Sequence, residues 1–258
     1  MNLASVHIPG SKIGDGRRRA NKYLNQKACE GCASKHISLC NVMDNDGLNI
    51  LSGLSSDIHK KAKQVICTED DNAEYLFNIR YGAVRISKML PDGRRQVTGF
   101  LFAGDFFGLS CKAQHSYTAE AITPVDICRF PRKKIVGLFQ EFPDLNERVF
   151  DMTRAELNST HAQMLLLGRK TAKEKLCSFL LAMRKKSSLL AKTGEDEVDL
   201  PMGRSDIADY LGLTVETVSR QFTSLNRLGL IELDGAHRVF LKNTERLSTM
   251  AEGGRILS

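Results

Sequence analysis

The chain contains no run of 18 or more apolar residues, and no small-residue cleavage site follows the basic residues Arg17 to Arg19. Neither a membrane span nor a secretory signal is therefore expected, and we expect a cytoplasmic protein. The sequence also lacks a dinucleotide-binding glycine fingerprint and a Walker loop. These absences argue against the common nucleotide-dependent enzymes, and we do not expect an enzyme.

The composition favours a protein that folds without disulfides and binds an anionic partner. At 258 residues the chain is long enough to bury a substantial core. Its 37 Lys and Arg against 30 Asp and Glu give a net charge of +7, which makes nucleic acid the first candidate partner. Seven cysteines without a secretory signal indicate a reducing compartment, where clustered thiols bind metal or sense redox state.

The order of patterns along the chain predicts an α+β protein with four parts. Residues 1–45 form an N-terminal arm that carries a cysteine cluster, and its first 28 or so residues have the composition of a mobile basic tail. Short apolar runs from Ile66 to Phe130, with a hairpin tip at Pro91-Asp92-Gly93, predict a small antiparallel barrel or jelly roll over 46–140. A helix over 141–170 and a winged helix-turn-helix over 171–250 follow.

The helical stretch from about Asp144 to Lys186 contains no proline, and only Gly168 interrupts it. A helix of this length should pack against something. It either covers the barrel or pairs with a second copy of the chain through a marginal seam, an arrangement that would suit a switch. The candidate dimerisation residues are Val149, Met152, Leu157 and Met164.

The most specific pattern lies between Arg204 and Leu241. Residues 205–211 form a first helix, Gly212-Leu213 a tight turn, and Thr214 the cap of a second helix. The second helix buries Val218, Phe222 and Leu225 on one face. Gly229 closes it, and residues 230–233 and 238–241 form a two-stranded wing.

Side chains near the start of a recognition helix reach base edges in the major groove. Arg220 can donate two hydrogen bonds to guanine, and Glu216 can accept one from a cytosine amine. Ser219 shares their face but is less base-specific. A solvated polar face is the alternative interpretation of the three residues.

Three cysteines lie within twelve residues in the pattern Cys29-x2-Cys32-x7-Cys40. Three local thiolates require a metal and a fourth ligand, and the spacing fits a [4Fe-4S] cluster and a four-cysteine zinc site equally well. The candidates for the fourth ligand are Cys67, Cys111, Cys128 and Cys177. Of these, Cys177 is expected to be a buried hydrophobic residue and Cys67 to pack in the core.

Residues 211–220, LGLTVETVSR, closely resemble the recognition motif of the superfamily of cyclic-AMP receptor proteins and fumarate-nitrate reduction (FNR) regulators. The Glu-x-x-Ser-Arg pattern is similar to the FNR branch, in which these residues read a TTGAT half-site of a palindrome bound by a homodimer. The resemblance implies base contacts by Glu216, Ser219 and Arg220. Other DNA contacts are expected from the following residues: Arg204, Ser205, Thr214, Val215 and Thr217. Val215 stands where the cyclic-AMP branch has arginine.

The resemblance extends over almost the whole chain from about Cys29. FNR-type oxygen sensors have a fourth cysteine in the last barrel strand just before a proline, and Ile127-Cys128-Arg129-Phe130-Pro131 resembles that strand. It implies a [4Fe-4S] cluster on Cys29, Cys32, Cys40 and Cys128, which favours the DNA-binding dimer until oxygen converts it to a [2Fe-2S] form. The longer x7 spacing resembles the FnrN and FnrL type, and Cys111 remains a competing ligand.

Other sensors remain as rival interpretations. A cyclic nucleotide is not expected, because 104–109 presents Phe106 and Phe107 and 115–119 has no arginine to neutralise a phosphate. Cys29-x-x-Cys32 alone could mimic a thiol enzyme, but it does not follow a strand and precede a helix. A zinc staple or a disulfide switch would keep the DNA function. Residues 91–95 are a plausible RNA polymerase contact by resemblance, or simply an exposed charged turn.

Overall fold

The structure is a computed structural model that describes residue 29 and residues 32–110, 112–189 and 196–254. The basic tail predicted for the first 28 residues and the competing ligand Cys111 lie outside the described residues. No helix in the described part of the chain combines the length and apolar character needed to cross a membrane.

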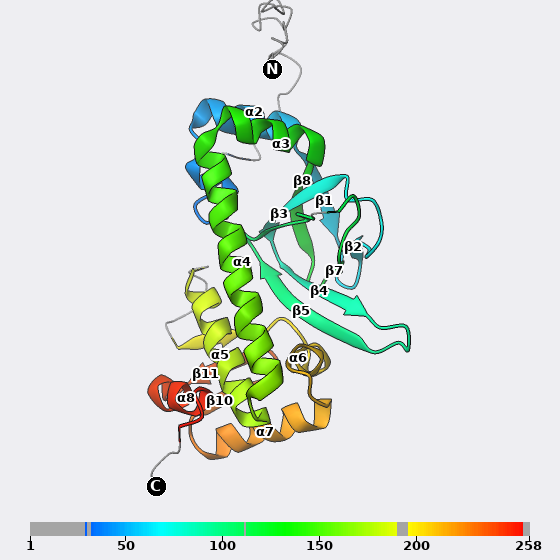
Figure 1. Ribbon diagram of the computed structural model, residues 1–258. Helices are drawn as coiled ribbons and strands as arrows, with labels where there is room; N and C mark the ends of the chain where they lie inside the picture. Colours follow the sequence, from blue (N-terminus) through cyan, green and yellow to red (C-terminus); the bar gives the residue numbers. More distant parts are fainter. Residues whose placement is uncertain (1–28, 30–31, 111, 190–195, 255–258) are drawn as a thin grey trace, which may run out of the picture.

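Eight strands form the N-terminal half in two antiparallel sheets of four (Figure 1). The strands are β1 (Ser56–Lys60), β2 (Val65–Cys67), β3 (Tyr75–Tyr81), β4 (Ala83–Met89), β5 (Arg95–Phe102), β6 (Phe106–Phe107), β7 (Thr118–Ala121) and β8 (Val125–Pro131). Their order is β1-β8-β3-β6 in one sheet and β2-β7-β4-β5 in the other. Phe77 and Ile79 of the first sheet pack with Val84 and Ile86 of the second. The predicted jelly roll is confirmed, as two open sheets rather than one closed barrel.

The hairpin between β4 and β5 turns where the sequence predicted. Gly93 has φ 87°, a conformation that favours glycine, and the Asp92 carboxylate accepts a hydrogen bond from the backbone N–H of Arg94 at 3.0 Å. Residues within the turn itself are therefore sufficient to form the hairpin tip.

One face of the first sheet is covered by the segment that carries the N-terminal cysteines and by helices. The 3-10 helix η3 (Leu39–Val42), α2 (Asn45–Leu54) and α3 (Arg132–Glu141) pack on it, and the N-terminal end of α4 (Pro143–Arg169) joins them (Figure 1). Leu39, Leu76, Phe130 and Ile135 form the centre of this cluster, each 2% exposed or less. Alternate residues of β3 and β8 thus face the helices, while the others face the second sheet.

The long helical stretch from Asp144 to Lys186 is two helices rather than one, and the break lies at the boundary at 170 that was expected between the helix and the winged helix-turn-helix. Helix α4 ends at Arg169, Lys170 is extended with φ −81° and ψ 142°, and α5 (Ala172–Leu189) begins anew. Thr171 and Glu174 form a reciprocal capping box: each backbone N–H is bonded to the other's side chain, at 2.8 and 3.4 Å. This pattern, Thr-x-x-Glu, was the missed signal in the sequence.

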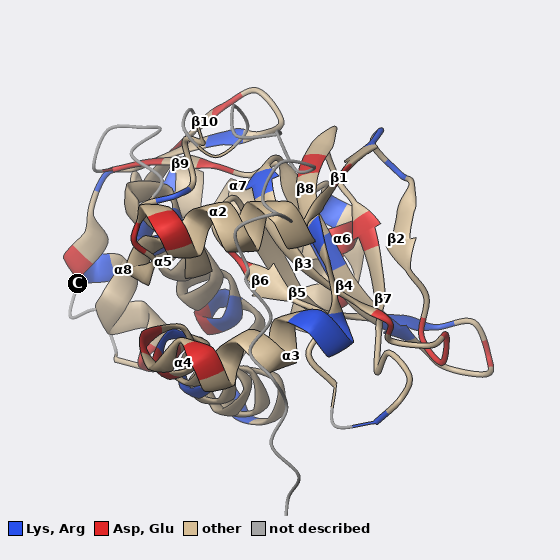
Figure 2. Ribbon diagram, turned by 90° about the horizontal axis from the view of Figure 1, so that it is seen from above, with Lys and Arg blue, Asp and Glu red and all other residues tan. Residues whose placement is uncertain are grey.

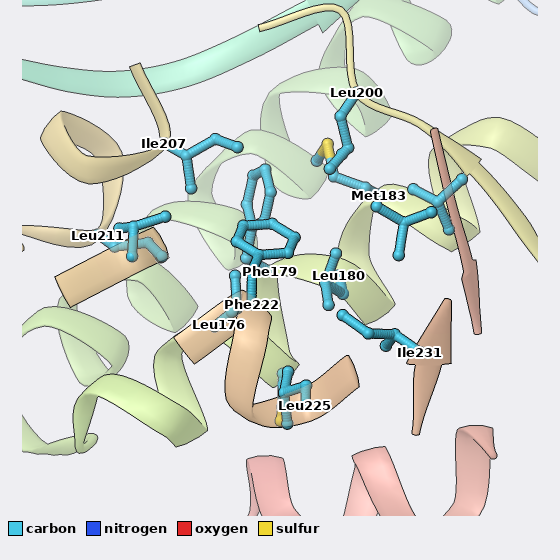
Figure 3. Packing of buried hydrophobic residues seen from close by; sticks show 14 of the residues in the cluster. Leu176, Phe179, Leu180, Met183, Leu200, Ile207, Leu211, Phe222, Leu225 and Ile231 are labelled. Atoms are coloured by element: carbon cyan, nitrogen blue, oxygen red, sulfur yellow. The ribbon is translucent and has the colours of Figure 1, made fainter. Parts of the chain in front are cut away.

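The C-terminal part is a winged helix-turn-helix. It contains β9 (Glu197–Asp199), α6 (Arg204–Leu211), α7 (Val215–Arg227), β10 (Ile231–Asp234), β11 (Arg238–Leu241) and α8 (Thr244–Ala251). The predicted two-stranded wing gains β9, so the sheet order is β10-β11-β9. Phe179, Leu180, Phe222 and Ile231 meet in its core (Figure 3).

This core continues into the jelly roll. Val97, Phe100 and Phe102 of β5 belong to the same buried cluster as the winged helix-turn-helix. The Phe100 ring lies 5.3 Å from that of Tyr210 and 6.2 Å from that of Phe179. The two halves of the molecule are therefore packed together in this conformation, with α4 running beside both (Figure 1).

Candidate nucleic-acid interface and thiol site

The turn between α6 and α7 has the geometry that the sequence predicted. Gly212 adopts φ 60° and ψ 45°, and the Leu213 backbone N–H donates to the Ala208 carbonyl at 3.0 Å. Thr214 caps α7, since its Oγ1 accepts from the Thr217 backbone N–H at 3.1 Å. Two short-range bonds thus fix the angle at which α7 leaves α6.

Helix α7 has one buried and one exposed face. Val218, Phe222 and Leu225 are 2% exposed or less, so the predicted buried face is confirmed. The side chains of Glu216 and Arg220 are 70% and 75% exposed and form an ion pair at 2.5 Å. Their hydrogen-bonding atoms are therefore paired with each other and lie on the surface.

The remaining polar residues of this face are positioned by the helix backbone. Ser219 is exposed, and its Oγ donates to the Val215 carbonyl at 2.9 Å. The Thr214 and Thr217 hydroxyls lie 2.8 Å apart at the start of the helix, where backbone N–H groups point outward. The Val215 side chain is 46% exposed. These residues form a continuous surface on the first turns of α7.

Arg204 and Ser205 begin α6 beside this surface. Ser205 is exposed, whereas the Arg204 guanidinium stacks 3.3 Å above the Phe222 ring and its Nη1 is buried without a hydrogen-bond partner. Burial lowers the pKa of Arg204. Arg204 therefore braces α6 against α7 in this conformation, with one donor left unpaired.

The four cysteines of the predicted metal site lie at the outer face of the sheet β1-β8-β3-β6. Cys40 lies in η3 and Cys128 in β8, and both pack against the same apolar cluster. Cys29 and Cys32 belong to the segment before η3, where the Cys32 backbone N–H donates to the Cys29 carbonyl at 3.4 Å. Among the described residues, no three His, Cys, Asp or Glu side chains are close enough to hold a metal ion together.

The pKa values of Cys40 and Cys128 are nevertheless affected by other thiols of this set. The pKa of Cys40 is raised to about 11, mainly by burial and also by the Cys29 and Cys32 thiols, while a hydrogen bond with Ser38 opposes the rise. The pKa of Cys128 is raised to about 12, mainly by burial and also by Asp57, Cys40 and Cys29, while the Arg80 charge opposes the rise. The pKa of each of these two thiols thus depends on other thiols of the set.

The other described cysteines have the places that the sequence predicted. Cys177 is fully buried in α5, and Cys67 is 8% exposed at the end of β2. Both have a pKa that burial raises to about 11. They behave as core residues and lie in different apolar clusters from Cys128.

The candidate dimerisation residues divide into two groups. Val149 is 7% exposed and Met152 packs on the cluster beneath α3, so both are engaged within their own chain. Leu157 is 55% exposed and Met164 66%. Phe150 and Leu165 are also more than half exposed, a feature that the sequence pattern did not single out.

One further set of residues was missed entirely. Arg85 and Arg95, on neighbouring strands of the jelly roll, bind the carboxylates of Asp206 and Asp209 on α6. Figure 2 shows acidic stretches of α6 beside basic stretches of the adjacent strands. Gln96 donates to the Asp209 carbonyl at 2.6 Å. These side chains are far apart in sequence, so only the docking of the two halves brings them together.

The chain combines a jelly-roll domain, a long helix with an exposed apolar face and a winged helix-turn-helix. This combination defines a class of transcription regulators in which one chain carries both a sensor domain and a DNA-binding domain. Residues 58–142 match the family model described as a cyclic nucleotide-binding domain, and residues 174–250 match the Crp-like helix-turn-helix domain. The chain belongs to the CRP/FNR family of transcription regulators.

Known members of this family are similar over most of their length. The nitrogen fixation regulation protein FixK of Bradyrhizobium diazoefficiens is 39% identical over 80% of this chain and 86% of its own. The transcriptional activator protein FnrL of Cereibacter sphaeroides is 34% identical over 85% of this chain and 90% of its own. The structure of FixK2 from Bradyrhizobium japonicum matches with a TM-score of 0.71 and 35% identity, over 79% of this chain and 99% of that one.

Proposed function

We propose that this regulator is a cytoplasmic oxygen sensor that binds a [4Fe-4S] cluster and, as a homodimer, a TTGAT-type palindromic operator. Oxygen would inactivate it. The proximity of the thiols carries the proposal: Cys40 and Cys128 pack against the same apolar cluster, and the Cys29 and Cys40 thiols contribute to the raised pKa of Cys128. The similarity to FnrL, a transcriptional activator, supports an activating role and hence contact with RNA polymerase.

The donor set fits an iron-sulfur cluster. Four thiols, Cys29, Cys32, Cys40 and Cys128, would be the ligands, and thiolate is the usual ligand of such clusters. When bound, the cluster would supply an oxygen-labile centre. The apolar surroundings of Cys40 and Cys128 keep these thiols protonated, so the chain must release their protons on binding, and the sheet then holds the resulting thiolates away from water.

DNA reading would use the exposed face of α7. Arg220 and Glu216 bond each other in the free protein, and the same atoms would exchange this bond for contacts to guanine and cytosine. Ser219 would make a less specific base contact. Thr214, Thr217 and Ser205 would bind phosphates and Val215 would make an apolar contact, while Arg204 would have to leave its stack on Phe222 to reach the DNA.

Dimerisation would use the exposed stripe of α4. Phe150, Leu157 and Met164 recur every seven residues, which is the spacing of a coiled-coil seam. Only these few apolar residues form it, so the dimer would be marginal and sensitive to a small free energy at the thiol site. Val149 and Met152 would support α4 from its inner side.

A zinc site or a thiol-disulfide switch on the same cysteines is the second candidate, since zinc accepts the same four thiolates. A cyclic nucleotide is less favoured by the residues, because 115–119 offers no arginine and Asp105 is bonded to Lys186. The hairpin tip at 91–95, of which residues 91–94 are exposed, is the proposed polymerase contact.

The test is anaerobic purification with iron, sulfide and zinc assays, followed by gel-shift on a TTGAT palindrome before and after air. About four irons per chain and DNA release in air would support the proposal. Cys128→Ala should lose the iron, whereas Cys67→Ala, which removes a buried thiol elsewhere, should keep it. Colourless, zinc-loaded protein that retains DNA in air would refute the oxygen sensor and leave DNA binding standing.

A further inference from the structure

Asn78 lies in the middle of β3, directly opposite Cys128 on the neighbouring strand β8. It is 2% exposed, and its side-chain Oδ1 is buried without a hydrogen-bond partner. A buried carboxamide in the interior of a sheet costs free energy unless its polar atoms are satisfied. An unpaired one therefore requires a physical explanation.

The side chain points to the face that carries the thiols. Phe77 and Ile79, its neighbours in the strand, pack between the two sheets, so Asn78 faces the opposite way, as do Leu76 and Cys128. Opposite residues of an antiparallel pair have Cβ atoms about 5 Å apart. On its other side Asn78 pairs with Phe106, which is aromatic, so the Cys128 sulfur is the polar neighbour across the strand.

The cysteine-bearing segment covers the same region. Gly104, two residues before β6, lies so close to Ile37 that a Cβ added to it would be 2.6 Å from Ile37 Cγ1. Ile37 lies between Cys32 and Cys40 in the sequence. The Ile37 carbonyl in turn accepts from Arg148 of α4 at 3.0 Å. The segment is thus held against the sheet beside the strand that pairs with Asn78.

We infer that Asn78 is a positioning residue for the metal site, donating a side-chain N–H bond to Cys128 Sγ or to a cluster sulfide when the cluster is bound. This inference rests on the proposed function. The two ends of a carboxamide exchange by rotation about one soft torsion, so the oxygen can accept from thiols and the NH2 group can donate to thiolates. The Oδ1 atom has no partner in this structure, and a donor bond from the NH2 group to the bound cluster would give the side chain a polar contact on this face.

Hydrogen bonds to the sulfur atoms of an iron-sulfur cluster are among the features that set its reduction potential. They stabilise the more negatively charged, reduced state and so oppose oxidation. Loss of the Asn78 bond should make the cluster easier to oxidise and shorten its lifetime in air, without changing which residues are its ligands.

The experiment compares Asn78→Val with Asn78→Thr, two side chains of nearly the same shape that both favour strands, of which only threonine retains a donor. The control is Ser87→Ala, which removes a buried polar group from the other sheet. Anaerobic iron content, the decay of the cluster's visible absorbance in air and its resonance Raman Fe–S stretching bands are measured for all four proteins, wild type included, after thermal unfolding shows that each is folded.

The expected result is full iron loading in every variant, decay about tenfold faster in Asn78→Val than in wild type, and intermediate decay in Asn78→Thr. The Fe–S stretching bands should shift in Asn78→Val and not in Ser87→Ala. Equal decay and unshifted bands in the two Asn78 variants and the wild type would overturn the inference and leave the proposed function intact. Wild-type protein without iron would overturn both.

Discussion

The guanidinium of Arg95 lies between two carboxylates of the DNA-binding domain, with Nη2 2.6 Å from Asp209 Oδ2 and 2.8 Å from Asp206 Oδ1. Arg85 binds the same Asp206 at 2.7 Å. Burial alone would lower the pKa of Arg95, but its bonds to the two aspartates raise it overall. Strands β4 and β5 therefore hold α6 in one orientation relative to the sensor domain.

Replacing Arg95 by alanine should weaken this interdomain contact. The side chains involved are 11% to 28% exposed, so water only partly compensates Asp209 for the loss of its partner, while Asp206 keeps its bond to Arg85. We expect a loss of about 2 kcal/mol in the free energy of unfolding and faster hydrogen exchange in α6. Urea unfolding and hydrogen-exchange mass spectrometry measure the two effects.

Arg94→Ala is the matched control, because the neighbouring arginine binds only Asp92 at the hairpin and is 77% exposed. Its replacement should change stability by less than about 0.5 kcal/mol. Equal effects of the two substitutions would show that the contact of Arg95 with α6 contributes nothing to the free energy of unfolding. An Arg95→Ala/Asp209→Ala double-mutant cycle then isolates the pair.

Arg220→Ala should weaken binding to a TTGAT palindrome by roughly 10- to 100-fold, because a bidentate contact to guanine is lost. Binding to unrelated DNA should change much less. Arg227→Ala, at the far end of the same helix and also exposed, should weaken binding to both DNAs by a similar small factor. Fluorescence anisotropy at fixed salt distinguishes these patterns, and a uniform loss for Arg220→Ala would argue against base reading.

Structural features that depend only on residues close together in the sequence could be predicted from it. Gly212 and Thr214 define the helix-turn-helix turn through bonds that span only a few residues, and both were identified. The break at Lys170 is equally local, but its capping residues Thr171 and Glu174 lie inside a stretch that otherwise favours helix. Apolar periodicity alone does not indicate these capping residues.

Features that depend on docking could not be predicted. The Arg95 to Asp209 bond joins residues 114 positions apart, and either side chain alone is typical of a solvated surface. Asn78 likewise lies in a strand with many apolar residues, and the sequence did not indicate that it would pair with Cys128 on the neighbouring strand. Pattern analysis assigns residues to faces of elements, whereas the pairing of faces requires the packed structure.

Leu157→Glu should shift the protein toward monomer, since a carboxylate would be buried without a partner in the proposed seam. We expect the dimer dissociation constant to rise at least about tenfold, measured by sedimentation equilibrium on anaerobic protein. Ser159→Glu introduces the same charge on an exposed position at the opposite side of α4 and should leave the dimer intact. Dimers of undiminished stability in Leu157→Glu would place the interface elsewhere.

The fully buried Cys177 gives a pH dependence with a definite sign. Burial raises its pKa from 9.0 to about 11, so the folded protein retains a proton that the unfolded chain releases. Its contribution to stability is present below about pH 9 and is lost as the pH rises through about 11. Cys177→Ala should cost about 1 to 2 kcal/mol at pH 7 through the smaller side chain, but its stability should fall less steeply above pH 9.

Urea unfolding at pH 7, 9 and 10 measures this difference, with Cys67→Ala as a second buried thiol whose pKa burial also raises to about 11. Lysines and tyrosines titrate in the same range, but they are common to all three proteins and cancel in the comparison. Converging stabilities of wild type and Cys177→Ala at high pH would show that the thiol is buried in its neutral form. Parallel curves would mean that the Cys177 thiol titrates alike in the folded and unfolded chain.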